Sequence, residues 1–214
     1  FTSMKKVVEN HSSIPVYCVN AAELMLEGHK QLIRNSIVIT GSKSGDTKET
    51  VAVVKWCKER GIETVAITKA ETPLAEIADH VCLIDSSGVE NTYLSFYYIL
   101  LKLAELRGEF PDYAQFASEM EHVHEGLVQV KEKFEPVAAK IAKQYHKEEY
   151  QMWVGSGTVW GDVYMFTMCI LEEMQWKRTK AVSSPEFFHG SLELVDEDTL
   201  VILVKGVDAC RPLD

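Results

Sequence analysis

The amino-acid sequence predicts an α/β protein built from parallel sheets flanked by helices. Short β-rich runs alternate with amphipathic helical segments along the 214 residues, which is the pattern of β-α-β units. The β-rich runs are apolar throughout instead of alternating, as expected of strands buried on both faces. The composition, with 46% apolar and 25% charged residues, is that of a folded globular protein. We therefore expect three-layer units, each with a parallel sheet between helices.

Seven runs are candidate strands, and the clearest unit lies between the second and the third. There, residues 47–60 are expected to form a helix in which Val51, Val54 and Cys57 recur at helical spacing. Gly61 follows as a left-handed stop before the next strand. The predicted strands are residues 16–19, 36–40, 64–68, 80–84, 152–155, 179–183 and 200–204.

The runs divide the chain into two units joined by a helical connector. A long, nearly strand-free helical stretch with dense charge on one face follows the fourth run. We expect a first domain over residues 1–112, a connector over 113–148 and the start of a second domain over 149–214. The chain opens on Phe1 and ends ten residues after its last predicted strand, so both units are expected to be truncated, the first without its first strand.

Charge and composition exclude several classes of protein. Lys and Arg number 22 against 32 Asp and Glu, a net charge of -10, which argues against a nucleic-acid partner. No apolar run approaches the roughly 18 to 20 residues that cross a bilayer, so no membrane partner is expected. Five cysteines without a CxxC pair indicate a reducing cytoplasm. The seven histidines show no ligand spacing, so we expect no metal.

A hydroxyl-rich loop follows the second run. Residues 41–47, GSKSGDT, run straight into a helix, so backbone N–H groups and the hydroxyls of Ser42, Ser44 and Thr47 converge on a helix N-terminus. That arrangement predicts an anion site. It is not a triphosphate-binding Walker A loop, because Asp46 stands where that motif needs glycine.

The hydroxyls of this loop also fit a simple helix cap, with Asp46 and Glu49 forming a capping box. Three hydroxyls are more than one cap requires, which favours the anion site. A second loop, residues 155–161, has the glycines of a dinucleotide-binding turn but carries Trp160 where glycine is required. We therefore expect no nicotinamide or flavin cofactor.

Two adjacent carboxylates interrupt an apolar helix predicted over residues 160–176. The helix is apolar nearly all round, so we expect it to be buried on more than one side. Glu172 and Glu173 then begin near apolar surface, which raises the pKa of an unpaired carboxyl toward the range that a general base or acid needs. Spacing alone does not choose between them, and one of them is equally placed to pair with Lys177 or Arg178. Helical spacing puts Phe166, Ile170 and Glu173 on one line, and Met165, Cys169, Glu172 and Trp176 on the next.

A histidine lies in the next predicted helix, which has Ser184 as its N-cap and Pro185 at its first position. Glu193 is one turn from His189, where a carboxylate orients an imidazole and favours its protonated form. A solvated surface histidine is the plain alternative. The buried line of this helix is expected to be Phe188, Leu192 and Val195.

Four segments together resemble the sugar isomerase (SIS) domain proteins, and specifically the fructosamine-6-phosphate deglycases, over essentially the whole chain. They are SIVITGSKSGDTKET, WVGSG, LEEMQW and SSPEFFHGSLELVDEDT. The most specific part is an E-x-x-W helix end followed by E-F-F-H-G, with the histidine 16 residues after the acid. In that pattern the acid lies three positions before the aromatic residue, which selects Glu173 over Glu172. The chain is similar, more distantly, to the isomerase half of glucosamine-6-phosphate synthase.

The resemblance implies a site and a reaction. The residues that match the family's site are the phosphate-binding Ser42, Lys43, Ser44 and Thr47, the catalytic Glu173 and His189, and the supporting Glu193. The implied substrate is a fructosamine 6-phosphate, the phosphorylated Amadori compound of an amino acid. It is converted to glucose 6-phosphate and free amine by proton transfer between C1 and C2 and hydrolysis of the imine, and no cofactor is implied.

The resemblance also implies an assembly and leaves two alternatives open. Family members pair two SIS domains and form dimers that share active sites, so we expect a homodimer or a larger assembly. They carry a strand and a Gly/Ser-rich loop before the region where this chain starts, and a C-terminal tail that contributes to the sugar site. One alternative is isomerisation or amination of a sugar phosphate, which uses the same proton transfer. The other is a non-catalytic sugar-phosphate sensor, which usually carries a basic helix-turn-helix segment that is not visible here.

Overall fold

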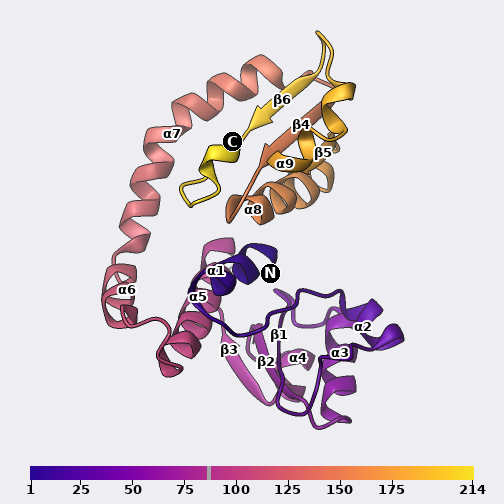
Figure 1. The fold of residues 1–214 in the computed structure, drawn as a ribbon, viewed down its shortest axis with the longest axis vertical. Coiled ribbons are helices and arrows are strands. Elements are labelled where there is room, and N and C mark those ends of the chain that lie inside the picture. The colour runs from indigo at the N-terminus through magenta and orange to yellow at the C-terminus, as the bar shows by residue number, and fades with distance from the viewer. Residues whose placement is uncertain (86–87) are drawn as a thin grey trace. The chain divides into compact units, whose positions relative to one another are not determined.

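The structure, a computed structural model, describes residues 1–85 and 88–214 as alternating strands and helices (Figure 1). The strands are β1 (Ile37–Gly41), β2 (Glu63–Thr68), β3 (His80–Leu83), β4 (Tyr150–Gly155), β5 (Arg178–Ser183) and β6 (Leu200–Leu203). The α-helices are α1 (Thr2–His11), α2 (Ala21–Glu27), α3 (Lys48–Lys58), α4 (Pro73–Ile77), α5 (Val89–Leu106), α6 (Tyr113–Met120), α7 (Val123–Tyr145), α8 (Val159–Met165) and α9 (Ser184–Phe187). A π-helix, η1 (Phe166–Glu172), and two 3₁₀ helices, η2 (Ser191–Leu194) and η3 (Arg211–Leu213), complete the list.

The chain divides into two compact units, which we describe separately. Residues 17–103 form the first sheet unit, and residues 1–16 together with 104–214 form the second sheet unit. This division differs from the predicted domain boundaries, because the first 16 residues group with the later part of the chain. The predicted connector is helical, as expected, and consists of α6 and α7.

The first sheet unit is a parallel sheet in the order β1-β2-β3. Its predicted β-α-β unit is confirmed, since α3 lies between β1 and β2 and Gly61 has the left-handed φ of +65° that ends such a helix. One side of α3 is buried against the sheet and its neighbours. The buried core residues of this unit include Leu24, Val53, Val54, Cys57, Ile62, Ala66 and Leu74.

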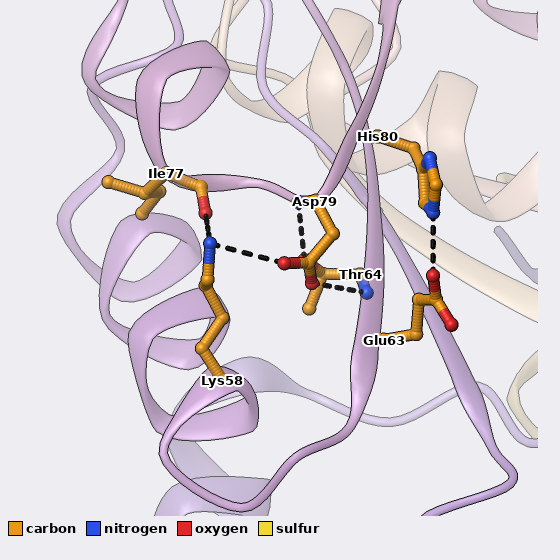
Figure 2. A network of polar contacts seen from close by, with 6 residues as sticks. All are labelled: Lys58, Glu63, Thr64, Ile77, Asp79 and His80. Atoms are coloured by element: carbon orange, nitrogen blue, oxygen red, sulfur yellow. Dashed lines mark hydrogen bonds and ion pairs between the residues drawn. The ribbon is translucent and has the colours of Figure 1, made fainter.

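A network of polar contacts joins the starts of β2 and β3 (Figure 2). The Asp79 carboxylate accepts hydrogen bonds from the Thr64 hydroxyl at 2.7 Å and the Thr64 N–H at 3.0 Å, and it pairs with Lys58 Nζ at 3.1 Å. The hydrogen bond from the Thr64 hydroxyl is the main cause that lowers the pKa of Asp79. Next to it, His80 and Glu63 form an exposed pair at 2.7 Å. These contacts join the end of α3 to the starts of β2 and β3, so they are structural.

The second sheet unit is a parallel sheet in the order β5-β4-β6. Its core is formed by Met152, Val154, Val182 and Phe187. The start of the chain joins this unit through α1, because Ser3 packs so closely on Gly161 of α8 that a Cβ at Gly161 would lie 2.3 Å from Ser3 Oγ. The hydroxyls of Ser12 and Ser13 also donate to the Glu109 carboxylate and lower its pKa to about 2.

Six of the seven predicted strands are present, and the run at residues 16–19 is not a strand. Tyr17 and Val19 in this run are 53% and 48% exposed, and Tyr17 packs on the His29 ring instead, with 4.7 Å between ring centroids. A four-residue apolar run becomes a strand only where a neighbouring strand accepts its hydrogen bonds. Among the described residues, no helix is long and apolar enough to cross a membrane.

Candidate functional site

The loop of residues 41–47 is held closely against the N-terminus of α4. Gly45 has a φ of +73°, and a Cβ on it would lie 2.3 Å from the Thr72 side chain. The Gly45 carbonyl accepts a hydrogen bond from the Leu74 N–H at 2.9 Å. At its start the loop is tied to β2, since the Thr68 hydroxyl donates to the Ser42 carbonyl at 2.8 Å. Only glycine meets both the steric and the backbone requirement at position 45.

The three loop hydroxyls named from the sequence do come together. Ser42 Oγ lies 2.8 Å from Thr47 Oγ1 and 3.4 Å from Ser44 Oγ, and it accepts a hydrogen bond from the Gly45 N–H at 3.0 Å. Ser44 also donates to the Asp46 carboxylate. Lys43 in the same loop is exposed. Rotatable hydroxyls that bond chiefly to one another can turn to donate to an incoming anion.

The helix-cap interpretation of this loop is wrong. The N-cap of α3 is Thr47, and no side chain makes a capping hydrogen bond to this helix in the described structure. The predicted capping box between Asp46 and Glu49 is therefore not formed. The first N–H groups of an uncapped helix point out of its N-terminus with partial positive charge. The loop thus combines three hydroxyls with an uncapped helix end, which is the chemistry that binds a phosphate.

The two adjacent carboxylates of the second sheet unit differ in their contacts. Glu172 accepts a hydrogen bond from the Thr179 hydroxyl at 2.6 Å, which fixes it to the start of β5. For Glu173, the described residues provide no side-chain hydrogen bond or ion pair. The Lys177 ammonium, which was one expected partner, donates instead to the carbonyls of His146 and Glu148. Glu173 is therefore the carboxylate that is available for chemistry.

The Cys169 thiol lies close enough to Glu173 to be affected by its charge. Burial raises the pKa of the Cys169 thiol, and the nearby Glu173 carboxylate raises it further. Both glutamates are exposed, so the burial that we expected to raise their own proton affinity is absent from this structure.

The predicted helix over residues 160–176 is interrupted by a π-helix. The α-helix α8 ends at Met165, and the Glu173 N–H bonds five residues back to the Met168 carbonyl at 3.1 Å. The wider π turn shifts side chains relative to a 3.6-residue period, so the two predicted lines of residues do not hold beyond Met165. The start of the segment is covered on two sides, since Gly161 packs on Ser3 of α1 and Val163 packs on Gly155 of β4, whereas Met168 and Met174 further along are 43% and 63% exposed.

This helical segment ends on an unusual residue. Trp176 has a left-handed φ of +56° and is 89% exposed. The following Lys177 N–H bonds back to the Leu171 carbonyl at 2.9 Å. A bulky residue in the left-handed region costs about 1 to 2 kcal/mol, and glycine normally takes this position.

His189 lies in an exposed turn and not in a helix. Helix α9 is only four residues long and ends at Phe187, with Ser183 and not Ser184 as its N-cap. The predicted buried line is wrong at Phe188 and Leu192, which are 68% and 43% exposed, whereas Val195 does pack against the core of this unit. Phe187 is the buried aromatic residue. Four residues do not complete a second helical turn, so helical spacing does not apply at position 189.

Glu193 follows in η2, and the described residues show no hydrogen bond between it and His189. Its supporting role stays a prediction.

The two predicted catalytic residues lie at opposite ends of β5. Glu173 comes just before β5, where its neighbour Glu172 is bonded to Thr179, and His189 comes one short helix after the strand ends. The six residues of β5 span about 17 Å at the usual rise per residue. One copy of this unit therefore does not bring the two side chains to one reacting centre.

A carboxylate network that the sequence analysis missed lies at the C-terminal ends of β4 and β5. Asp214 accepts hydrogen bonds from the hydroxyls of Ser156 and Ser184, each at 2.7 Å, and from the Gly206 N–H at 2.9 Å. Burial alone would raise the pKa of Asp214, but these hydrogen bonds outweigh it and the pKa is lowered. The signal was the Gly-Ser-Gly-Thr sequence after β4, whose donors need acceptors that come from far along the chain.

Asp208 completes the same loop. Its carboxylate accepts a hydrogen bond from the Thr158 N–H at 2.6 Å, which is the main cause that lowers its pKa, and another from the Cys210 N–H at 2.8 Å. A small, mostly apolar cavity of about 110 Å³ adjoins this network. Its walls are Val154, Ser184, Phe187, Phe188, Val201, Leu203, Leu213 and Asp214. In residues 1–85 and 88–214 there is no cluster of three or more His, Cys, Asp or Glu side chains placed to hold a metal ion.

Comparison with known proteins shows what this chain is similar to. Residues 3–104 match the SIS domain family. Fructosamine deglycase FrlB of Bacillus subtilis (strain 168) is 32% identical over 203 residues, which are 91% of this chain and 61% of that protein. Glutamine–fructose-6-phosphate aminotransferase (isomerizing) 2 of Mus musculus is 25% identical over 218 residues, which are 96% of this chain and 31% of that protein.

A solved structure gives the same result. A Bacillus subtilis protein described as a candidate phosphosugar isomerase superposes with a TM-score of 0.93 at 29% identity, over 99% of this chain and 66% of its own. Residues 3–104 therefore match a SIS domain, and the chain as a whole is similar to a fructosamine deglycase and to a protein described as a candidate phosphosugar isomerase. It spans less than two thirds of the length of each of these relatives.

Proposed function

We propose that this protein converts a fructosamine 6-phosphate into glucose 6-phosphate and a free amine, without a cofactor. The observation that carries the proposal is the hydroxyl cluster of Ser42, Ser44 and Thr47 at the uncapped N-terminus of α3. A sugar phosphate dianion fits this loop because it accepts hydrogen bonds from hydroxyls and is attracted by the helix dipole. The similarity to a fructosamine deglycase supports the choice of reaction.

The acid-base steps are assigned to Glu173. The carboxylate removes a proton from C1 of the open-chain ketosamine while the C2 oxygen takes up a proton, which gives an enolamine. The protonated Glu173 then returns its proton to C2 and the nitrogen releases its own, which leaves an imine between C1 and nitrogen. Water adds to the imine and the amine leaves, so that C1 becomes the aldehyde of glucose 6-phosphate. His189 assists ring opening and donates a hydrogen bond to the C2 oxygen. Binding of the phosphate away from the reacting carbons holds C1 and C2 in place.

The proposal requires a second copy of the chain. Glu173 and His189 are separated by the length of β5 in one copy, so we assign them to one site only if the histidine comes from another subunit. This agrees with the expectation of a homodimer or larger assembly with shared active sites. We also propose that the two sheet units are both SIS-type domains, since each has a parallel sheet with a Gly-Ser loop leading into a helix.

The decisive experiment incubates the chain with a panel of 6-phosphorylated Amadori compounds that carry different amino acids. Glucose 6-phosphate is measured with a coupled dehydrogenase, and free amine is measured in parallel. Equal amounts of both products, from at least one compound, are expected. Binding of glucose 6-phosphate by calorimetry together with no turnover of any compound would contradict the deglycase and favour a sensor.

The second candidate function is isomerisation or amination of a sugar phosphate. It is favoured by the similarity to an isomerising aminotransferase and to a protein described as a candidate phosphosugar isomerase. Both reactions would use the same Glu173 proton transfer between C1 and C2. Fructose 6-phosphate as substrate distinguishes the two. An isomerase converts it to an aldose phosphate, whereas a deglycase has no amine to release from it, since fructose 6-phosphate carries none on C1.

A further inference from the structure

Thr68 is a buried polar residue beside the hydroxyl-rich loop of residues 41–47. It is the last residue of β2, the central strand of the first sheet, and it is fully buried. Its hydroxyl donates a hydrogen bond to the Ser42 carbonyl at 2.8 Å. A buried hydroxyl needs a hydrogen-bond partner, so this contact has a structural role whatever else it does.

The sheet around Thr68 fixes the position of its hydroxyl. The Thr68 carbonyl accepts a hydrogen bond from the Ile84 N–H at 3.0 Å, and Thr68 pairs in register with Leu83 of β3. The preceding Ile67 carbonyl accepts a hydrogen bond from the Ser42 N–H at 3.2 Å. Threonine also has few χ1 rotamers, because its side chain branches at Cβ. The donor is therefore held at a constant place relative to the start of the loop.

The hydrogen bond from Thr68 determines which way the next peptide group faces. In a planar trans peptide, the carbonyl of one residue and the N–H of the next point in opposite directions. The Ser42 carbonyl is held toward β2, so the Lys43 N–H points away from that strand. Within the part of the chain that the structure describes, this N–H has no hydrogen-bond partner. A backbone N–H without a partner, close to a helix N-terminus, is suited to donate to an anion.

A second threonine of the same strand makes a different contact. Thr64 is also fully buried, and its spacing of four residues puts it on the same face of β2 as Thr68. Its hydroxyl donates at 2.7 Å to the Asp79 carboxylate, in the polar network at the other end of the strand (Figure 2). The two threonines thus share a strand, complete burial and a hydroxyl hydrogen bond. They differ in whether the acceptor belongs to the loop.

We propose that Thr68 is a positioning residue of the anion site, which holds the peptide between Ser42 and Lys43 so that the Lys43 N–H donates to a bound phosphate. The Thr68 hydroxyl itself does not touch the ligand, because it is buried and bonded to the Ser42 carbonyl. It orients the peptide before the ligand arrives, so binding requires no reorientation of the backbone. The inference rests on the loop as the phosphate site of the proposed function, but not on the reaction.

The role is tested by comparing Thr68→Val with Thr64→Val in calorimetry with glucose 6-phosphate and with inorganic phosphate. Valine keeps the branched shape and removes the hydroxyl, so both variants should lower the urea midpoint of unfolding by similar amounts. Thr68→Val should raise the Kd of both probes roughly tenfold, because a hydrogen bond to a charged group is misdirected. Thr64→Val should leave both Kd values within about twofold of wild type, since its site is independent of the loop. Thr68→Ser keeps the donor and should restore the wild-type Kd to within about twofold.

The Lys43 amide gives a signal that a purely structural Thr68 would not affect. In ¹⁵N–¹H spectra of the whole chain, the Lys43 amide proton should shift downfield when phosphate is added, because it donates a charge-assisted hydrogen bond. This shift should be largely lost in Thr68→Val and kept in Thr64→Val. Absence of the shift in the wild-type chain overturns the inference without any variant.

Three other results overturn the inference. They are equal Kd changes in the two valine variants, an unchanged Kd in Thr68→Val, and a weaker affinity of Thr68→Val for glucose 6-phosphate but not for inorganic phosphate. The last result would mean that Thr68 acts on the sugar. Phosphate binding as expected, with no turnover of any Amadori compound, would contradict the deglycase and support the positioning role. The two failures are therefore distinguishable.

Discussion

The two Gly-Ser loops of this protein have similar positions but opposite chemical states. Residues 41–47 follow β1 and residues 155–158 follow β4, and each loop leads into a helix. In the first loop, three hydroxyls bond mainly to one another in front of an uncapped helix. In the second, the carboxylates of Asp208 and Asp214 take up the hydroxyl and N–H donors. The first loop is therefore open to an external anion, and the second already holds anions that belong to the chain.

The two loops therefore differ in role: the first is suited to binding a ligand, and the second stabilises the fold. A loop whose donors are satisfied by its own carboxylates stabilises the fold and has no capacity left for a phosphate. In the first loop Ser44 donates to Asp46, but the Ser42 and Thr47 hydroxyls bond to each other and keep that capacity. The following changes test the contrast.

The largest effect is expected from Glu173, the proposed acid-base residue of the second sheet unit. Glu173→Gln keeps the size of the side chain and removes its charge, so kcat should fall by about 10² to 10⁴. Glu172→Gln is the matched control, because Glu172 is held by Thr179 and should affect stability more than turnover. Steady-state kinetics with a phosphorylated Amadori compound checks both. Equal kcat losses in the two variants would remove the distinction between these residues.

A smaller effect is expected from the open loop. Ser42→Ala with Thr47→Ala removes two donors to a charged ligand, so KM should rise roughly 10- to 100-fold, with kcat changed much less. Ser156→Ala in the filled loop should leave KM unchanged and lower the free energy of unfolding by about 1 to 3 kcal/mol, because it removes a buried partner of Asp214. Calorimetry with glucose 6-phosphate and urea denaturation separate the two outcomes. Comparable KM increases in both variants would show that the loops do not differ.

The second loop, residues 155–158 with Asp208 and Asp214, should also make the free energy of unfolding depend on pH. The folded-state pKa values of Asp208 and Asp214 are lowered by hydrogen bonds, so their contribution is complete above the unfolded pKa of about 4 and is lost as the pH falls through the lower folded values. Thermal unfolding is measured at pH 6 and at pH 3. The fall in Tm between these two pH values should be about half as large, or smaller, in the double variant Asp208→Asn with Asp214→Asn than in the wild type. An identical acid loss in wild type and variant would contradict this role.

The smallest effect is expected at the two helix ends that use left-handed residues. In the first sheet unit α3 ends on Gly61, and in the second the helical segment ends on Trp176. Trp176→Gly should raise the free energy of unfolding by about 1 kcal/mol, because it relieves the left-handed backbone and an 89% exposed ring has little packing to lose. Gly61→Ala should lower it by a similar amount. Loss of stability in Trp176→Gly would mean that the ring is covered in the assembled protein.

The sequence predicted those parts of the molecule that local patterns determine. Six strands, α3 and its Gly61 stop, and the hydroxyl loop follow from apolar runs, spacing and turn residues that are close together along the chain. The run at residues 16–19 failed because strand formation also needs a neighbour to pair with. The predicted helix around Glu173 failed because a single π turn shifts every later side chain, and periodicity assumes one constant turn.

The features that were missed depend on long-range contacts. Asp208 and Asp214 come 50 or more residues after the loop that they fill, and no local pattern links them to Ser156 or Thr158. The resemblance selected Glu173 over Glu172, but the different contacts of the two carboxylates depend on Thr179, which is on the next strand. The fold class was therefore predictable from the sequence, whereas the chemical state of each loop was not.

The placement of Glu173 and His189 on either side of β5 has a consequence for mixtures of inactive chains. A chain with Glu173→Gln still offers an intact imidazole, and a chain with His189→Ala still offers an intact carboxylate. In the dimer with shared sites proposed above, equal amounts that exchange subunits give hybrids as half of the dimers, and each hybrid has one complete centre out of two. About a quarter of the wild-type rate should then reappear from two preparations that have none alone.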